Sequence, residues 1–246
     1  MRIVLEITYI GTNYNGWQVQ DNKPTIQKVV QDAIRELTKE DVKIYASGRT
    51  DTGVHAYKQV AHFDTNSKIK PDSFAFALNP LLPSDVKIVK SYMVSDDFNA
   101  RFDVKKKTYL YKFYINRVEL PLEVNRALQV PFKVDKEKMH QCAKLFIGTF
   151  DFTSFCKVGK EEKDRVRTIF KCELKETDIN HFEVEICGNG FLHNMVRIIV
   201  GTIIDVGIGK IELQTVKDLL IQKSCSRSLA GRTLPPYGLY LKNVEY

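Results

Sequence analysis

Hydrophobic positions alternate with polar ones at the start of the chain and then change to a helical spacing. Ile3, Leu5, Ile7 and Tyr9 fall on one face of a predicted strand over residues 2–9. Between residues 25 and 37 the apolar side chains recur every three or four positions, which predicts a helix with one buried stripe. The next predicted elements are strands over 42–46 and 57–63, a short helix near 71–78 and a strand over 86–94. This order, β-α-β-β-α-β, is that of a ferredoxin-like unit.

The second half of the chain repeats the same order of periodicities, although its residues do not repeat those of the first half. The predicted elements are a strand over 106–115, a helix over 136–147, strands over 165–177 and 181–187, helices over 192–206 and 212–221, and a last strand over 238–244. The patterning therefore predicts an α+β fold made of two ferredoxin-like units with antiparallel sheets. We expect one domain over residues 1–103 and a second over 104–246.

Composition favours a folded protein without membrane spans or bound metal. Hydrophobic residues make up 43% of the 246 residues, enough for a core in each domain. The longest apolar stretch, 195–204, is interrupted by Arg197 and is too short to cross a bilayer. Met1 leads directly into strand-like alternation, so we expect no signal peptide. The five cysteines are odd in number and form no C-x-x-C pair, and the five histidines are scattered. We expect a cytoplasmic protein with reduced thiols and no metal.

The positive net charge of the chain indicates a negatively charged binding partner. The net charge is +7 and the pI is near 9.0, which points to a polyanion. Residues 101–117 are basic and aromatic in alternation, with one acid, Asp103. The basic residues are Arg101, Lys105, Lys106, Lys107, Lys112 and Arg117, and the aromatic residues are Phe102, Tyr109, Tyr111, Phe113 and Tyr114. This composition suits nucleic acid. An amphipathic strand with a solvated face explains part of it, and a strand can bury one face and bind with the other.

The segment Ser-Gly-Arg-Thr-Asp-Thr-Gly-Val-His, residues 47–55, holds the strongest candidate for chemistry. Gly48 and Gly53 allow a sharp turn between two predicted strands, and Asp51 lies near its tip. Asp-Thr-Gly also occurs in aspartic proteases, but a second copy is absent and Arg49 would hold the carboxylate ionised. From the loop alone, a turn in which Asp51 only hydrogen-bonds backbone is an equal alternative.

The wider sequence resembles the tRNA pseudouridine synthase A family. The loop is similar to that family's catalytic loop, and four further motifs follow the family order. They are Tyr14-Asn15-Gly16-Trp17-Gln18-Val19-Gln20; Phe98-Asn99-Ala100-Arg101-Phe102 with Lys107-Thr108-Tyr109-Leu110-Tyr111; residues 188–197 with Val200-Gly201; and residues 230–239. Thr52, Leu234 and Pro236 depart from the family pattern at positions that are not catalytic.

The resemblance implies a reaction, a substrate and an assembly. Family members isomerise uridine to pseudouridine at positions 38–40 of the tRNA anticodon stem-loop, need no cofactor, and form homodimers with a catalytic cleft between the two halves of each chain. Asp51 matches the family nucleophile. Whether its carboxylate attacks C1′ or C6, or assists a glycal route, is left open by the sequence.

Arg197 is a second candidate because it interrupts an apolar helix. A buried arginine needs a partner, and the resemblance makes Asp51 the expected one. The alternative is that Arg197 reaches the surface along its own stem.

The remaining candidates would contact the substrate. Tyr109 matches the family's active-site tyrosine, since a phenol can stack on uracil and accept a proton; it could also be an ordinary core residue. Arg49 would reach into the RNA, with a salt bridge inside the loop as the alternative. Leu239 would wall the uracil pocket, with a core position in its strand as the alternative. Candidate phosphate contacts are Arg101, Lys105, Lys106 and Lys107, followed by Lys157, Lys160, Arg165 and Arg167.

Two other functions remain to be weighed. A non-catalytic RNA-binding module of the RRM type shares the order of elements, but the sequence lacks its RNP1 pattern. A pseudouridine synthase paralogue with a different RNA target would share the aspartate and the fold. The near end-to-end resemblance favours the tRNA enzyme.

Overall fold

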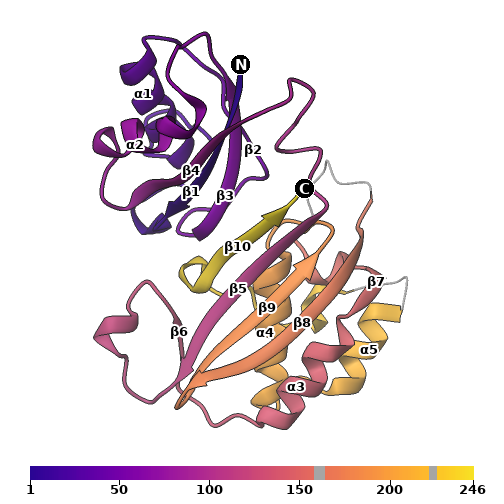
Figure 1. Ribbon diagram of the computed structural model, residues 1–246. Helices are drawn as coiled ribbons and strands as arrows, with labels where there is room; N and C mark the ends of the chain where they lie inside the picture. The colour runs from indigo at the N-terminus through magenta and orange to yellow at the C-terminus, as the bar shows by residue number, and fades with distance from the viewer. Residues whose placement is uncertain (158–163, 222–225) are drawn as a thin grey trace. The chain divides into compact units, whose positions relative to one another are not determined.

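The computed structural model describes residues 1–157, 164–221 and 226–246. They form two compact units (Figure 1). The first unit comprises residues 1–105 together with 240–246, and the second comprises residues 106–239. The fold is a mixed α+β fold, as the hydrophobic pattern predicts.

The first unit is built around β1 (Arg2–Tyr9), which lies between two antiparallel neighbours. These are β3 (His55–Asp64) on one side and β4 (Val86–Val94) on the other. The short β2 (Tyr45–Ala46) pairs with the far end of β3, and β10 (Leu239–Glu245) pairs in parallel with its first two residues. Beginning and end of the chain therefore contribute strands to the same unit.

Two helices, α1 (Ile26–Thr38) and α2 (Phe74–Leu78), pack together in this unit (Figure 1). The predicted stripe of α1 is buried through Ile26, Val30, Ala33 and Ile34. Lys39 ends the helix in the left-handed conformation, with φ of 62°.

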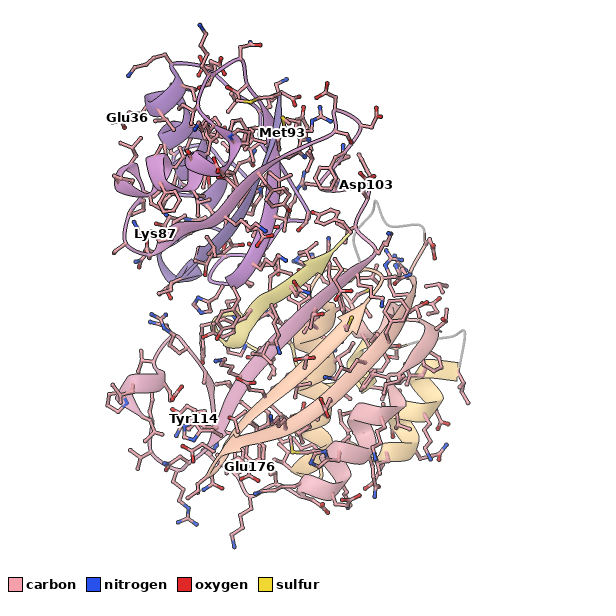
Figure 2. All side chains as sticks on the ribbon, in the orientation of Figure 1. Glu36, Lys87, Met93, Asp103, Tyr114 and Glu176 are labelled. Carbon is pink, nitrogen blue, oxygen red and sulfur yellow. The ribbon has the colours of Figure 1, made fainter. Side chains whose placement is uncertain are left out.

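The second unit has the antiparallel strand order β5 (Lys106–Ile115), β9 (His181–Gly188), β8 (Val166–Asp178) and β7 (Gly148–Asp151). The short β6 (Leu128–Val130) pairs in parallel with the end of β5. Helices α3 (Lys136–Leu145), α4 (Met195–Gly207) and α5 (Leu213–Ile221) cover one face of this sheet (Figure 1). Glu176, labelled in Figure 2, ties β8 to α3 through an ion pair with Lys136 at 2.8 Å.

Single 3-10 turns connect these elements. They are Gly11–Asn13, Pro71–Ser73, Asn79–Leu81, Pro121–Glu123, Thr153–Phe155, Arg227–Leu229 and Pro236–Gly238. None of the helices in the described ranges is long and apolar enough to cross a membrane.

The structure differs from the predicted pattern at a few ends and at one boundary. The strand expected over 42–46 is paired only at Tyr45 and Ala46. Helix α4 begins at Met195 because Asn194 adopts the left-handed conformation, with φ of 62°, and ends the preceding turn. The division expected at 103/104 falls at 105/106, and residues 240–246 join the first unit because β10 pairs with β3.

Candidate active site

The loop that carries Asp51 connects β2 to β3 and is fastened at its first residues by a buried glutamine. Ser47 donates its backbone N–H to the Val60 carbonyl at 2.8 Å and its hydroxyl to Oε1 of Gln59 at 2.6 Å. Nε2 of Gln59 donates to the Gly48 carbonyl at 2.9 Å. Gln59 is fully buried, so these bonds are shielded from water. They give the loop a fixed start.

The opening motif, residues 14–20, packs against the Asp51 loop through backbone hydrogen bonds. The Trp17 N–H donates to the Thr50 carbonyl at 3.1 Å, and the Gly53 N–H donates to the Tyr14 carbonyl at 3.3 Å. Gly16 lies between them with φ of +80°, and a Cβ there would stand 2.4 Å from the Thr50 oxygen. Only glycine allows this approach. The motif that resembles the family's opening motif is therefore the scaffold of the Asp51 loop.

A buried tyrosine completes the support. The Tyr9 hydroxyl lies 2.8 Å from Oγ1 of Thr50, one residue before Asp51. Burial raises the pKa of the Tyr9 phenol, so it remains protonated and can hydrogen-bond. With both flanks held, Asp51 is half-buried at the tip, and its carboxylate is presented by a rigid frame.

Arg49 is exposed on the same loop. Its Nε donates to Oε1 of Gln18 at 3.1 Å, so the opening motif also orients this side chain. The other two nitrogens of the guanidinium belong to a side chain that is exposed.

In the second unit, Tyr109 and Tyr111 lie on the same strand, β5, in different surroundings. Tyr109 is half-buried and meets the Phe191 ring edge to face, with centroids 5.2 Å apart and planes at 87°. Tyr111 is fully buried, and its hydroxyl donates to the Pro235 carbonyl at 2.8 Å. Of these two, Tyr109 has the more accessible ring.

Arg197 projects from the first turn of α4, whose other described residues are all buried. Its Nε donates to the Leu234 carbonyl at 2.6 Å, and Nη1 donates to Oδ1 of Asn194 at 2.8 Å. Two bonds at different nitrogens fix the plane of the guanidinium. The stem of Arg197 does not simply extend into solvent, since its head group is held within its own unit.

The other predicted residues occupy varied positions. Leu239 is buried, with 6% exposure, where β10 begins. Arg101, Lys105 and Lys106 are exposed and Lys107 is half-buried. Arg101 lies over the Phe102 ring at 5.5 Å, and Nζ of Lys106 lies 5.3 Å from the Phe170 ring centroid. Lys160 lies outside the described residues.

The sequence prediction did not give a supporting role to several residues that have one in the structure. Gln59 and Tyr9 hold the Asp51 loop, and Asn194 and Leu234 hold Arg197. Gln59 shares its strand with other polar residues, among them Lys58 and His62, so the sequence provides no distinct signal for it. Leu234 lies in the closing motif, residues 230–239, but nothing in the sequence marks it as a partner of Arg197, because it contributes a backbone carbonyl.

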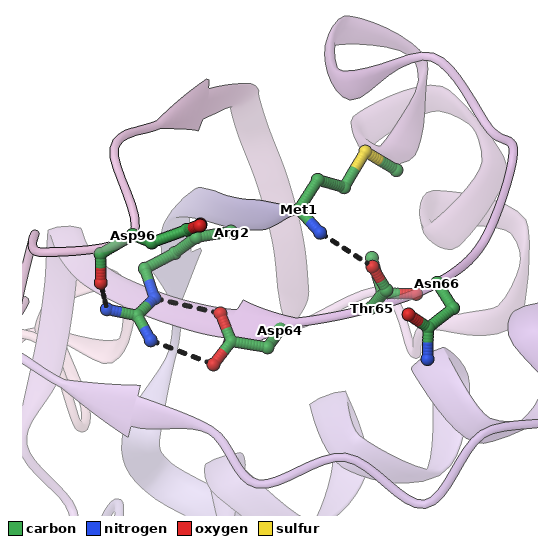
Figure 3. Close-up of a pocket in the computed structure, with 6 residues that line it drawn as sticks. All are labelled: Met1, Arg2, Asp64, Thr65, Asn66 and Asp96. Carbon is green, nitrogen blue, oxygen red and sulfur yellow. Dashed lines mark hydrogen bonds and ion pairs between the residues drawn. The ribbon is translucent and has the colours of Figure 1, made fainter.

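The first unit also has a polar cavity of about 320 Å³ (Figure 3). Its lining includes Met1, Arg2, Asp64 and Asp96. Asp64 ends β3, whereas the loop precedes His55, and a strand of ten residues separates the two by about 30 Å. Arg2 is bound through two nitrogens to Asp64, both at 2.8 Å, and this bond lowers the pKa of that carboxyl. The charged side chains of Arg2 and Asp64, which line the cavity, are therefore paired with each other.

Within the described ranges, no group of three or more His, Cys, Asp or Glu side chains is arranged to hold a metal ion.

Comparison with known proteins identifies the family. The model of a family described as "tRNA pseudouridine synthase" matches residues 7–103 and 142–246. These segments contain Asp51 and Arg197, and Tyr109 lies between them. Proteins named tRNA pseudouridine synthase A are similar along their whole length. That of Caldicellulosiruptor saccharolyticus is 47% identical, with 99% of each chain covered, and that of Bacillus subtilis is 43% identical, with 100% of this chain and 99% of the other covered.

Similarity to solved structures is weaker. A Cbf5-Nop10-Gar1 complex has 13% identity and a TM-score of 0.36, over 82% of this chain and 54% of that chain. The family match and the full-length relatives agree with the resemblance predicted from the five motifs. The chain belongs to the tRNA pseudouridine synthase family and is an isomerase that converts uridine in tRNA to pseudouridine.

Proposed function

We propose that the protein modifies uridines at positions 38–40 of the tRNA anticodon stem-loop, as a cytoplasmic homodimer. The observation that carries this proposal is the full-length similarity to proteins named tRNA pseudouridine synthase A, at 41–47% identity in five of them. It covers 99% of the chain in each of these five, and so spans the Asp51 loop and the four motifs around it.

Asp51 is the proposed nucleophile. The reaction breaks the C1′–N1 bond of uridine, turns the uracil while it stays bound, and forms a C1′–C5 bond. A base removes the proton on C5 and N1 takes up a proton, so the net change moves one proton from C5 to N1. Because atoms are only rearranged, the reaction consumes no cofactor. A half-buried carboxylate on a loop held from both sides supports this role, since it can be aimed at a reacting atom without a large cost of ordering.

Arg197 and Tyr109 serve the same reaction in this proposal. Arg197 would keep the Asp51 carboxylate ionised and oriented, and its fixed guanidinium plane supports that task. Tyr109 would stack on the uracil and accept the C5 proton, and the half-buried position of its ring supports contact with a base. Leu239 would add an apolar wall for the uracil.

The RNA-binding role falls to basic residues, all of them exposed except the half-buried Lys107. The target uridine must leave the base stack before Asp51 can reach it. Arg49, exposed on the same loop, would occupy the vacated space or grip the adjacent phosphate. Arg101, Lys105, Lys106 and Lys107 would neutralise phosphates around it.

Each half of the chain is proposed to be a ferredoxin-like unit that contributes residues to one reaction. In the first half, the strand order β4-β1-β3 with β2 against β3 supports this arrangement. In the second half, the antiparallel order β5-β9-β8 supports it.

The alternative is a paralogue that modifies a different RNA. Mapping pseudouridines at nucleotide resolution in RNA from cells that lack the protein distinguishes the two. We expect pseudouridine to disappear from tRNA positions 38–40 and to return when the gene is restored. Retention at 38–40 with loss at another site would contradict the proposal and favour the paralogue.

A further inference from the structure

The segment 230–235, here called the closing loop, lies directly on the backbone of helix α4. A Cβ added to Gly201 would stand 2.0 Å from the Arg232 carbonyl oxygen, and a Cβ added to Gly231 would stand 2.3 Å from the Thr202 nitrogen. Both glycines are needed because the two backbones touch. The position of the closing loop is therefore tied to that of α4.

Two side chains of α4 fasten the closing loop. Oγ1 of Thr202 accepts the Gly231 N–H at 2.9 Å and donates to the Ile198 carbonyl at 2.9 Å. Oδ2 of Asp205 accepts the Arg232 N–H at 3.2 Å, and Oδ1 lies 3.7 Å from Nε of the same arginine. Thr202 is fully buried and Asp205 is 6% exposed. These two residues, three positions apart, lie on one face of the helix.

The carboxylate of Asp205 is costly for a residue that only fills space. Its Oδ1 is buried and forms no hydrogen bond with the described residues. A buried carboxylate that is incompletely bonded destabilises the fold relative to an apolar side chain of similar size. Both polar contacts of the Asp205 carboxylate are instead made with Arg232 of the closing loop, so the position of that loop is the property that Asp205 serves.

The closing loop carries the carbonyl that orients Arg197. Leu234 accepts from Nε of Arg197 at 2.6 Å, and the Leu234 N–H donates back to the Arg197 carbonyl at 3.4 Å. Thr202 and Asp205 lie one to two helical turns beyond Arg197 on the same helix, and the closing loop connects the two places. A shift of the loop would move the guanidinium, and a misplacement of about 1 Å at a reacting group can cost on the order of a hundredfold in rate.

We propose that Thr202 and Asp205 are positioning residues, which act on catalysis through the closing loop and Arg197. The inference rests on the proposed role of Arg197 in the reaction. Both side chains are buried, and neither is among the groups proposed to contact the uridine or to bind RNA. Loss of either bond should therefore lower kcat and leave the KM for tRNA nearly unchanged.

The test uses the full-length enzyme with Thr202→Val, which keeps the volume and removes the hydroxyl. We expect kcat to fall at least tenfold with KM within twofold of the wild type. Thr202→Ser keeps the hydroxyl and should restore most of the rate. Thr38→Val is the matched control, because Thr38 makes the same bond to a carbonyl four residues back, at 2.8 Å from Ile34, in a helix of the other unit. Its kcat should match the wild type.

A double-mutant cycle separates positioning from general destabilisation. If Thr202 acts through Arg197, the double variant Thr202→Val/Arg197→Met should be no slower than Arg197→Met alone. The inference would be overturned if the loss of kcat in the double variant equalled the product of the two single losses, or if Thr202→Val had the kcat of the wild type.

If Thr202→Val does not fold, Asp205→Asn and Asp205→Leu carry the same test. The amide keeps an acceptor for the Arg232 N–H and should retain more than ten times the rate of leucine; equal rates would overturn the inference.

Failure of this inference is distinct from failure of the proposed function. Wild-type turnover by Arg197→Met would remove Arg197 from the reaction, and with it the basis of the inference. A large loss in Arg197→Met together with additive losses in the double variant would leave the proposed function intact and overturn the positioning role alone.

Discussion

Tyr109, Tyr111 and Tyr114 lie on one aromatic strand, and their surroundings differ. The phenols of Tyr111 and Tyr114 are buried and each makes a hydrogen bond to backbone, the first with Pro235 and the second with Leu120. Tyr109 keeps part of its ring accessible beside Phe191. The proposed proton acceptor, Tyr109, is therefore the only one of these three tyrosines that is not fully buried.

Tyr109→Phe should bind tRNA as the wild type does and lose most turnover. The phenyl ring retains the stacking surface, whereas the oxygen that accepts a proton is gone; general-base catalysis typically contributes about a hundredfold to ten-thousandfold. Single-turnover rates of pseudouridine formation and tRNA Kd, measured on one preparation, check both parts.

Tyr114→Phe is the matched control on the same strand. Its hydroxyl accepts the Leu120 N–H at 3.0 Å, so removal of that oxygen should lower the free energy of unfolding by about 1 kcal/mol and leave turnover unchanged. Wild-type turnover by Tyr109→Phe would return Tyr109 to the structural residues of the strand.

Single residues also mark how far the sequence could predict the site. Arg197 stands out in the sequence because a charge inside an apolar helix is expensive. Its partners Asn194 and Leu234 do not stand out, since one is an ordinary turn residue and the other contributes only a carbonyl 37 positions away. Side-chain chemistry is visible in a sequence, and backbone partners become visible only in the fold.

The opening motif, residues 14–20, has a structural role that a motif alone does not reveal. It forms the base on which the Asp51 loop rests, and Gly16 makes the closest contact with that loop. The motif should therefore affect catalysis without touching the substrate.

Gly16→Ala should abolish turnover in protein that still folds, because a methyl group 2.4 Å from the Thr50 oxygen displaces the residue before Asp51. Gly209→Ala is a control of similar backbone strain, since Gly209 has φ of +75° and nothing within 4 Å of an added Cβ. Strain in the left-handed region costs about 1–2 kcal/mol in both variants. Both variants should therefore unfold at a lower temperature than the wild type, whereas only Gly16→Ala should lose turnover. Equal activity of the two folded variants would contradict the role of the motif.

The lysine run at the start of β5, Lys105 to Lys107, can be tested as a phosphate-binding element. Replacing all three lysines by alanine should weaken binding about equally across tRNA species. The slope of log affinity against log salt should become shallower by roughly 0.7 to 0.9 for each phosphate that the protein no longer neutralises.

A triple alanine variant of the exposed Lys138, Lys144 and Lys175 controls for the change in net charge. It should leave the slope near that of the wild type. An unchanged slope in the Lys105–Lys107 variant would mean that the run is a solvated face and that phosphates bind elsewhere, with Lys157, Arg165 and Arg167 as the next candidates.

Long periodic elements were predictable, and short or dependent ones were not. The periodicity of α1 and β5 places each within one residue of its observed limits. Strands β6 and β7, of three and four residues, are too short to show a period and depend on their neighbours for hydrogen bonds. The start of α4 depends on the left-handed conformation of Asn194, which no local pattern requires.

At the scale of the whole molecule, the last strand belongs to the first unit. A single boundary in the sequence, such as the predicted 103/104, cannot describe this arrangement. Residues 240–246 belong with residues 1–105, and Tyr246 donates its hydroxyl to the Ala100 carbonyl at 2.8 Å. The parallel pairing of β10 with β3 connects Tyr240 to His55, which are far apart in the sequence. Hydrophobic patterning predicts that β10 is a strand and gives no information on its partner.

The intact enzyme should need no metal ion, because a rearrangement of one nucleotide needs neither a redox centre nor a metal-bound nucleophile. Protein treated with EDTA, then freed of chelator and metal by desalting, should retain full turnover on tRNA folded beforehand. Desalting keeps the chelator from the tRNA, whose own fold depends on cations. A stoichiometric loss of activity that one divalent ion restores would contradict this expectation.

The central claim is that Asp51 of this chain forms pseudouridine in tRNA. The most direct measurement compares purified wild type and Asp51→Asn on unmodified tRNA, with pseudouridine quantified at each position and tRNA affinity measured in parallel. Asparagine is nearly the same size and cannot act as the nucleophile. We expect the wild type to form pseudouridine at positions 38–40, and Asp51→Asn to bind tRNA with near-wild-type affinity and to form none. Measurable turnover by Asp51→Asn, or none by the wild type, would contradict the account.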